Sequence, residues 1–196
     1  MKNAVIVYYH PYDGSFCHAI LESTKKGLMT GGFSVDVIDL QADNFNPVMS
    51  SADLLGFVKH QMIDEQSKDY VQRLKKANKL IFIFPIWWEL MPAMVKGFID
   101  KVIFPGSTYE NAKTVTGMAS SLPNLKQTTM ITTMNTPKYV YQFIFGNAIK
   151  KAMISGTFKK TGIKKIKWIN LSGVKSRTQE KRGTWLHKIE KDMALK

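Results

Sequence analysis

The sequence is poor in cysteine and has no long apolar run. Its single cysteine, Cys17, excludes an intramolecular disulfide framework and a cysteine-rich zinc site. No apolar stretch approaches the roughly 20 residues of a membrane-spanning helix, and the short run after Met1 lacks the flanks of a signal peptide. We therefore expect a cytosolic protein that inserts into no membrane and folds as one domain over residues 1–196.

Acidic residues are scarce only in the last third of the chain. Before residue 138 there are 13 basic and 12 acidic residues, whereas from Lys138 onward there are 15 basic and 3 acidic residues. Such a basic segment favours phosphate-bearing cofactors, nucleic acid or anionic membrane surfaces as ligands. The lysines interleave with apolar residues at helical and strand spacing, however, which favours an ordinary solvated face.

Several common functional patterns are also missing. The four histidines, His10, His18, His60 and His187, show no metal-ligand spacing, so we expect no metal site. The loop after the first apolar run lacks both the G-x-G-x-x-G spacing of the dinucleotide fingerprint and the lysine of a P-loop. Any cofactor must therefore be held by another arrangement.

Apolar runs typical of strands alternate with amphipathic helical segments along the chain. The predicted strands cover residues 4–9, 34–40, 79–84, 127–133 and 163–171, and the predicted helices cover residues 15–30, 64–77, 92–102, 139–153 and 178–194. This alternation is typical of an α/β fold with a doubly wound parallel sheet. Right-handed crossovers gather the carboxyl ends of the strands at one edge, where ligands of such folds bind.

Three loops follow strands at that edge. In residues 10–16, a strand runs into a helix, and the first N–H groups of that helix and the Ser15 hydroxyl suit a phosphate. Ser15 is equally an ordinary N-cap. In residues 85–92, Trp87 and Trp88 stand between prolines, which suits a planar aromatic ligand or a cover for the core beneath. Residues 132–137 suit the polar edge of a heterocycle or a plain turn.

Together these loops resemble the NAD(P)H quinone oxidoreductase family, flavoproteins of flavodoxin-like fold. Residues 84–102, FPIWWELMPAMVKGFIDKV, are close to the family pattern P-x-x-W-x-x-x-P-A-x-x-K-G-x-x-D. His10-Pro11 followed by Ser15-Phe16 is similar to the family's phosphate-binding loop, and residues 106–109 match the segment that carries an aromatic residue near the partner subunit's flavin. The resemblance implies a five-stranded parallel sheet of order 2-1-3-4-5 with helices on both faces.

The resemblance also implies which residues bind the flavin. The phosphate and ribityl chain fall to His10, Ser15 and Phe16, the isoalloxazine to Pro85, Ile86, Trp87 and Trp88, and its pyrimidine side to Thr132 and Thr133. Cys17 and Asn135 are further cofactor-binding candidates. Tyr109 and Tyr139 are candidate contacts of the substrate pocket, and no side chain is expected to be catalytic because the flavin carries the chemistry. Cys17 stands where the family often has Asn, and Met134-Asn135 where it often has Gly-Gly, which predicts an altered pocket.

The implied reaction passes a hydride from NAD(P)H through bound FMN, or FAD, to a quinone or a similar small aromatic acceptor. The implied assembly is a homodimer with each active site at the subunit interface. Reduction of nitro or azo compounds on the same scaffold is one alternative, and a flavin-bearing redox-sensing regulatory subunit is another. A nucleic-acid binder using the basic segment gives no role to Trp87 and Trp88, so we expect no nucleic-acid partner.

Overall fold

The computed structural model describes residues 2–195 and has a five-stranded parallel sheet at its centre. The strands are β1 (Lys2–Tyr8), β2 (Phe33–Asp39), β3 (Lys79–Pro85), β6 (Gln127–Met134) and β7 (Ile166–Ser172). Their order in the sheet is β2-β1-β3-β6-β7. This order confirms the predicted 2-1-3-4-5 arrangement, because β4 (Tyr109–Asn111) and β5 (Met118–Ser120) form a separate antiparallel hairpin.

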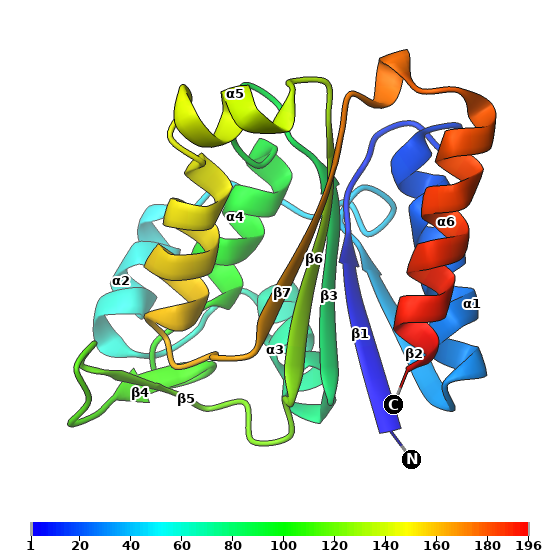
Figure 1. Cartoon of the computed structure of the whole chain (residues 1–196). Helices are drawn as coiled ribbons and strands as arrows, with labels where there is room; N and C mark the ends of the chain where they lie inside the picture. The colour runs from blue at the N-terminus through cyan, green and yellow to red at the C-terminus, as the bar shows by residue number, and fades with distance from the viewer. Residues whose placement is uncertain (1, 196) are drawn as a thin grey trace.

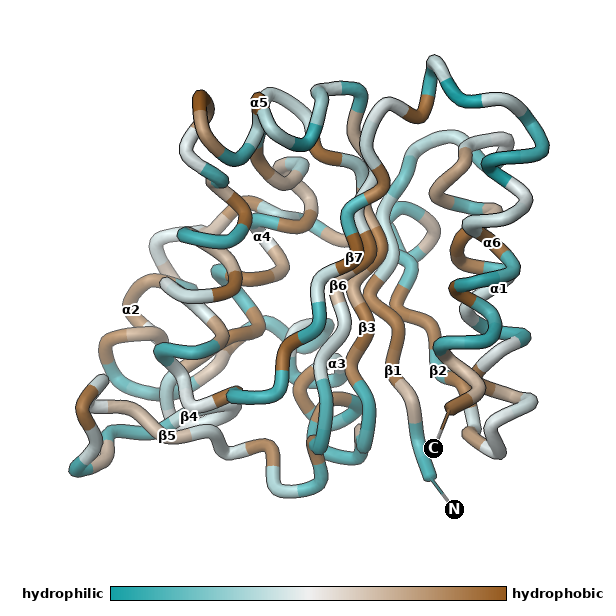
Figure 2. The backbone as a smooth tube through the Cα atoms, viewed as in Figure 1, coloured by the Kyte–Doolittle hydropathy of each residue, from teal (hydrophilic) through white to brown (hydrophobic). Residues whose placement is uncertain are grey.

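Helices cover both faces of the sheet, as predicted (Figure 1). One face carries α1 (Phe16–Thr30) and α6 (Gln179–Ala194), and the other carries α3 (Glu65–Lys76), α4 (Ala93–Val102) and the π-helix η1 (Lys150–Lys159). In Figure 2 the central strands are mostly hydrophobic along their length, whereas the outer helices alternate between the two colours. A sheet buried on both faces needs this pattern.

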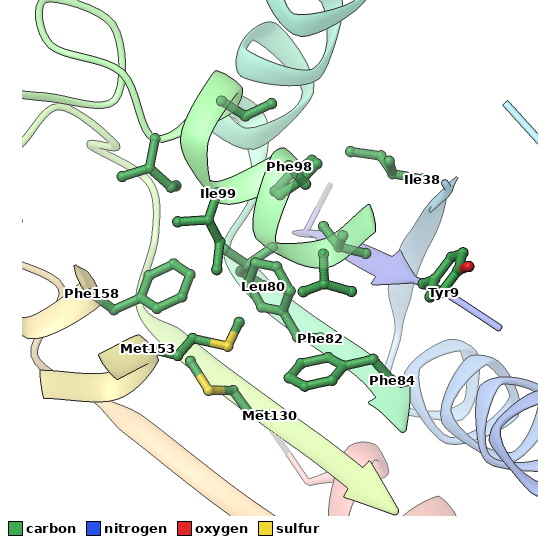
Figure 3. Close-up of a cluster of buried hydrophobic side chains, with 14 of the residues drawn as sticks. Tyr9, Ile38, Leu80, Phe82, Phe84, Phe98, Ile99, Met130, Met153 and Phe158 are labelled. Atoms are coloured by element: carbon green, nitrogen blue, oxygen red, sulfur yellow. The ribbon is translucent and has the colours of Figure 1, made fainter. Parts of the chain in front are cut away.

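Side chains that alternate along each strand build two separate cores. In β1, Ile6 packs with the residues of α1 and α6, whereas its neighbours Val5 and Val7 pack with α3 and α4. The second core is rich in aromatic rings, with Phe98 of α4 lying 5.9 Å from Phe82 of β3 between ring centroids (Figure 3). The two cores together hold the strand ends in fixed positions.

The predicted helix over residues 139–153 is wrong, because the chain breaks it in two. Helix α5 (Lys138–Phe143) is followed by Gly146 and Asn147, both at positive φ (72° and 54°), and η1 begins only at Lys150. Two successive residues in the left-handed region end any right-handed helix. The hydroxyl of Tyr141 accepts a 2.8 Å hydrogen bond from the Ile149 N–H and so satisfies the backbone at the break.

Four short elements were not predicted, and one strand begins later than predicted. The additional elements are α2 (Ser51–Lys59), the β4–β5 hairpin and the 3₁₀ turn η2 (Val174–Ser176). A capping box between Ser50 and Asp53 starts α2, a signal that was readable in the sequence. Strand β7 starts at Ile166 rather than at Ile163, because the Ile163 N–H donates to the Phe158 carbonyl at the end of η1.

A buried lysine connects three helices on one face of the sheet. Lys101 of α4 places its Nζ 3.4 Å from the Asp64 carboxylate and 3.9 Å from that of Asp53, at the starts of α3 and α2. Burial raises the pKa of Asp64, but hydrogen bonds from Ser67 and the charge of Lys101 outweigh it and hold the pKa below 3.8. The stabilisation that Asp64 provides is therefore present above that pH and is lost as the carboxylate protonates in acid.

Candidate functional site

The carboxyl ends of β1, β3, β6 and β7 border a cavity of about 410 Å³ at the upper edge of the sheet in Figure 1. Its lining includes nine of the eleven predicted cofactor residues, namely His10, Ser15, Phe16, Cys17, Pro85, Ile86, Trp87, Thr133 and Asn135. Four further residues, Tyr12, Met134, Val174 and Lys175, complete the wall. Loops far apart in sequence therefore meet where ligands of doubly wound folds bind.

The start of α1 forms the anion-attracting part of this cavity. Ser15 is the N-cap of α1, and its Oγ accepts a 3.1 Å hydrogen bond from the His18 N–H. The first N–H groups of a helix have no acceptor within the helix and lie at the positive end of its dipole. The first turn of α1 carries no acidic side chain. Phe16 and Cys17 thus offer backbone donors in a field that favours a phosphate.

His10 is fixed next to the aromatic wall as a neutral ring. Its Nδ1 accepts a 3.1 Å hydrogen bond from the Tyr12 N–H. Burial lowers the pKa of His10, so the imidazole is uncharged at neutral pH and carries its proton on Nε2. The ring meets Trp87 edge-on at 6.2 Å between centroids, and Tyr9 meets Trp87 in the same way at 6.0 Å. His10 therefore offers a neutral donor rather than a positive charge.

Cys17 is part of the cavity wall and is not a nucleophile. Its Sγ lies 3.3 Å from the Thr133 Oγ1, and the thiol is buried. Burial raises the pKa of Cys17 to about 11. The thiol is therefore protonated at neutral pH, which leaves it unreactive. The contact ties the first turn of α1 to the end of β6.

The two tryptophans of the loop after β3 differ in position, one at the cavity and one in solvent. Trp87 lines the cavity, whereas Trp88 is 98 % exposed and does not. Trp87 and Leu90 exchange backbone hydrogen bonds of 3.0 and 3.1 Å across a two-residue turn, and Trp88 and Glu89 occupy it at φ 49° and 65°. Non-glycine residues rarely adopt this region, and such strain collects at functional sites.

The next loop holds this strained turn in place. Glu89 accepts a 2.8 Å hydrogen bond on its Oε1 from the Thr136 hydroxyl, and its carbonyl accepts one of 3.1 Å from the Tyr141 hydroxyl. The turn after β3 is therefore connected to the loop after β6 and to α5. These contacts fix Trp87 at the mouth of the cavity.

Replacing Trp88 with asparagine should raise the free energy of unfolding by about 1 kcal/mol, because asparagine adopts the left-handed region at a lower cost than tryptophan. Chemical denaturation of the ligand-free protein measures this gain. Tyr139→Asn is the matched control, since Tyr139 is also exposed but does not have a positive φ. A Trp88→Asn variant no more stable than the parent would show that the turn is not strained.

Three other candidate residues lie outside this cavity. Thr132 is fully buried, and its hydroxyl donates to Asn170 Oδ1 at 3.2 Å and accepts from Trp168 Nε1 at 3.0 Å. Tyr139 is exposed on α5, and Tyr109 lies on β4 and lines a different cavity. In Figure 1, β4 lies near the lower end of the molecule, far from the upper edge of the sheet. The contacts assigned to Tyr109 and Tyr139 stay predictions.

A fourth loop, after β7, also lines the cavity and was not among the three predicted from the sequence. Gly173, at φ 71°, turns the chain after β7 into η2. The Lys175 N–H then donates a 3.1 Å hydrogen bond to the Asn135 Oδ1. The rule that ligand residues follow each strand would have found Val174 and Lys175 if it had been applied to the last strand as well.

Residues 2–195 contain neither a helix long and apolar enough to cross a membrane nor a group of three or more potential metal ligands. The cavity at the upper edge of the sheet is lined mainly by hydroxyls, amides and aromatic rings. The cavity can hold a planar organic ligand with an anionic group at one end.

Known proteins with related sequences carry oxidoreductase names. A protein from Haemophilus influenzae called an uncharacterized NAD(P)H oxidoreductase is 28% identical over 85% of this chain and 81% of its own length. NAD(P)H dehydrogenase [quinone] 1 from Rattus norvegicus is 32% identical over 57% of this chain, but the match spans only 47% of the rat protein. The resemblance to NAD(P)H quinone oxidoreductases is therefore confirmed.

Solved structures extend this likeness over the whole described chain. The crystal structure of Smu.1420 from Streptococcus mutans is 31% identical, with a TM-score of 0.83 over 98% of this chain and 99% of that one. An NAD(P)H:quinone oxidoreductase from Methanothermobacter marburgensis has a TM-score of 0.86 at 21% identity over 98% and 96% of the two chains, which shows the shared fold. A family model described as Flavodoxin-like fold matches residues 2–192. The chain belongs to this flavodoxin-like family.

Proposed function

We propose that this protein is a flavin-dependent oxidoreductase that passes a hydride from NAD(P)H to a quinone or a similar aromatic acceptor. The observation that carries the proposal is one cavity that combines the start of α1 with the Trp87 wall at the carboxyl ends of the strands. The oxidoreductase names of the sequence relatives support it. We further propose that residues 1–196 act as one domain in the cytosol.

The residues of the cavity fit FMN. The N–H groups of Phe16 and Cys17, with the Ser15 hydroxyl, would hold the phosphate. Pro85, Ile86 and Trp87 would lie along the isoalloxazine, with Thr133 and Asn135 near its polar side. The volume of about 410 Å³ is within the range of small-molecule and cofactor sites. When bound, the flavin supplies the hydride acceptor and donor.

The side chains of the cavity leave the redox step to the cofactor. His10 is neutral and hydrogen-bonded through Nδ1, and Cys17 is protonated. Protonated Cys17 cannot act as a general base at neutral pH, and the lone pair of His10 Nδ1 is already occupied by the Tyr12 N–H. Trp87 is 42 % exposed at the mouth, so a second planar molecule can reach the cavity from solvent. The protein would therefore contribute binding, orientation and a partly open face.

Exposed apolar side chains support a homodimer. Leu54, Leu55 and Val58 of α2 are more than half exposed, and so are Phe143 and Ile144 at the end of α5. Figure 2 shows hydrophobic stretches on both elements, on the same side of the sheet. Exposed apolar groups of this kind often mark protein–protein contacts. We propose that a second copy covers them and brings its own aromatic residues, Tyr109 among the candidates, towards the site.

Anaerobic half-reactions test the proposed function. Protein loaded with FMN should lose its absorbance near 450 nm when NADH or NADPH is added and recover it when benzoquinone follows. An azo dye added in a parallel experiment distinguishes the alternative acceptor class. Loss of absorbance without recovery by either acceptor would favour a redox-sensing subunit, for which the exposed Phe143 and Ile144 offer a partner surface. A bound flavin that NADH and NADPH both fail to reduce would contradict the proposal.

A further inference from the structure

A second cavity lies at the opposite edge of the sheet, where the five strands begin. Its volume is about 500 Å³. The first residue of every strand lines it, namely Lys2, Phe33, Lys79, Gln127 and Ile166. This edge is at the bottom of Figure 1, near the point marked N. A seven-residue strand spans about 20 Å at about 3.3 Å per residue, so a ligand here cannot touch the proposed flavin cavity.

The lining of this second cavity is strongly basic. Five of its residues are lysines, Lys2, Lys79, Lys126, Lys165 and Lys167, and none carries a carboxylate. Within residues 2–195, only Lys167 of these five forms an ion pair, at 2.8 Å from Asp192. Four ammonium groups therefore share one concave surface without an acidic partner from the described chain.

The surroundings of Lys79 show that the ammonium groups of this cavity repel one another. Its Nζ donates a 2.8 Å hydrogen bond to the Leu195 carbonyl and lies 4.4 Å from the centroid of the Phe33 ring. Burial lowers the pKa of Lys79, and the neighbouring charge of Lys2 lowers it further. Like charges held together in a partly buried site repel one another, and a bound anion would relieve that repulsion.

We propose that this basic cavity binds a small compound carrying several phosphate groups. Its volume is that of small-molecule sites, which argues against an extended polymer as the main ligand. Lysine ammonium groups bind phosphate as point charges, and several of them favour a multiply charged ligand over a single carboxylate. Phe33 and Ile166 supply an apolar floor. Lys165 and Lys167 belong to the basic segment, and the proposed redox function gives these two lysines no role.

Isothermal titration calorimetry of the full chain with inorganic tripolyphosphate tests the proposal. Inorganic phosphate, which has a single phosphate group, is the comparison ligand. The Lys126→Gln/Lys165→Gln variant changes two exposed lysines of the cavity and should bind tripolyphosphate at least tenfold more weakly. Lys150→Gln/Lys159→Gln removes the same charge from η1, away from the cavity, and should bind like the parent. Lys79→Gln should weaken binding as well, with circular dichroism confirming that each variant is folded.

Four results would overturn the proposal. The parent chain could fail to bind tripolyphosphate, or bind it no more tightly than inorganic phosphate. The two double variants could lose affinity equally, which would show attraction to net charge alone. A single-stranded oligonucleotide could bind more than tenfold tighter than tripolyphosphate, which would identify the surface as a nucleic-acid site instead.

Discussion

Replacing Ser15 with aspartate should lower the affinity for FMN by about 100-fold, or about 2.7 kcal/mol, while leaving the fold intact. Aspartate is as good an N-cap as serine and suits the positive end of the helix, so α1 keeps its start. The new carboxylate, however, occupies the place proposed for the phosphate. Two like charges about 4 Å apart near a protein surface repel by about 4 kcal/mol, which is enough for the expected loss.

Riboflavin, which lacks the phosphate, makes this test specific. Ser15→Asp should change riboflavin binding little, so the ratio of FMN to riboflavin affinity should collapse. Thr178→Asp is the matched control, because Thr178 caps α6 in the same way and does not line the cavity. Fluorescence quenching of each flavin gives the affinities. An equal loss for FMN and riboflavin, or none for either, would contradict a phosphate site at the start of α1.

Replacing Lys101 with methionine should lower the free energy of unfolding by about 3 kcal/mol, because it leaves two partly buried carboxylates without their cation. The Lys101 side chain is 5% exposed, and those of Asp53 and Asp64 are 14% and 29% exposed. Methionine fills much of the same volume, so the loss comes mainly from charge. Denaturant unfolding at neutral pH measures it.

Two further variants identify the cause of that loss. Lys96→Met removes a lysine from the same helix. The exposed ion pair of Lys96 with Asp100 should contribute at most about 0.5 kcal/mol to the free energy of unfolding. Adding Asp53→Asn and Asp64→Asn to Lys101→Met should recover most of the stability, since asparagine still caps a helix and carries no charge. If the triple variant is as unstable as Lys101→Met, the loss comes from packing and not from uncompensated charge.

The sheet was predictable because its signals are local. Continuous apolar runs such as residues 79–84 indicate strands buried on both faces, and the alternation with helices limits the topology to a few arrangements. The break after α5 was not predictable in this way. Only the paired left-handed conformations of Gly146 and Asn147, stabilised by the contact between Tyr141 and Ile149, end the helix there. That contact depends on the folded chain.

The candidate site was predictable as a set of loops but not as a set of side chains. The rule that ligands bind after the strands identified most of the cavity wall. It does not give the direction of each side chain, because neighbours in a strand point to opposite faces. Thr133 therefore reaches the cavity while Thr132 bonds inside the sheet, and the turn that separates Trp87 from Trp88 is likewise a property of backbone geometry.

The binding of FMN itself tests the central claim most directly. Purified protein mixed with excess FMN and passed through a desalting column should emerge yellow, with one flavin per chain by its visible absorption spectrum. The cavity between the start of α1 and Trp87 predicts that result, because it offers both a phosphate site and an aromatic wall. Protein that emerges colourless, and whose tryptophan fluorescence FMN does not quench, would contradict it.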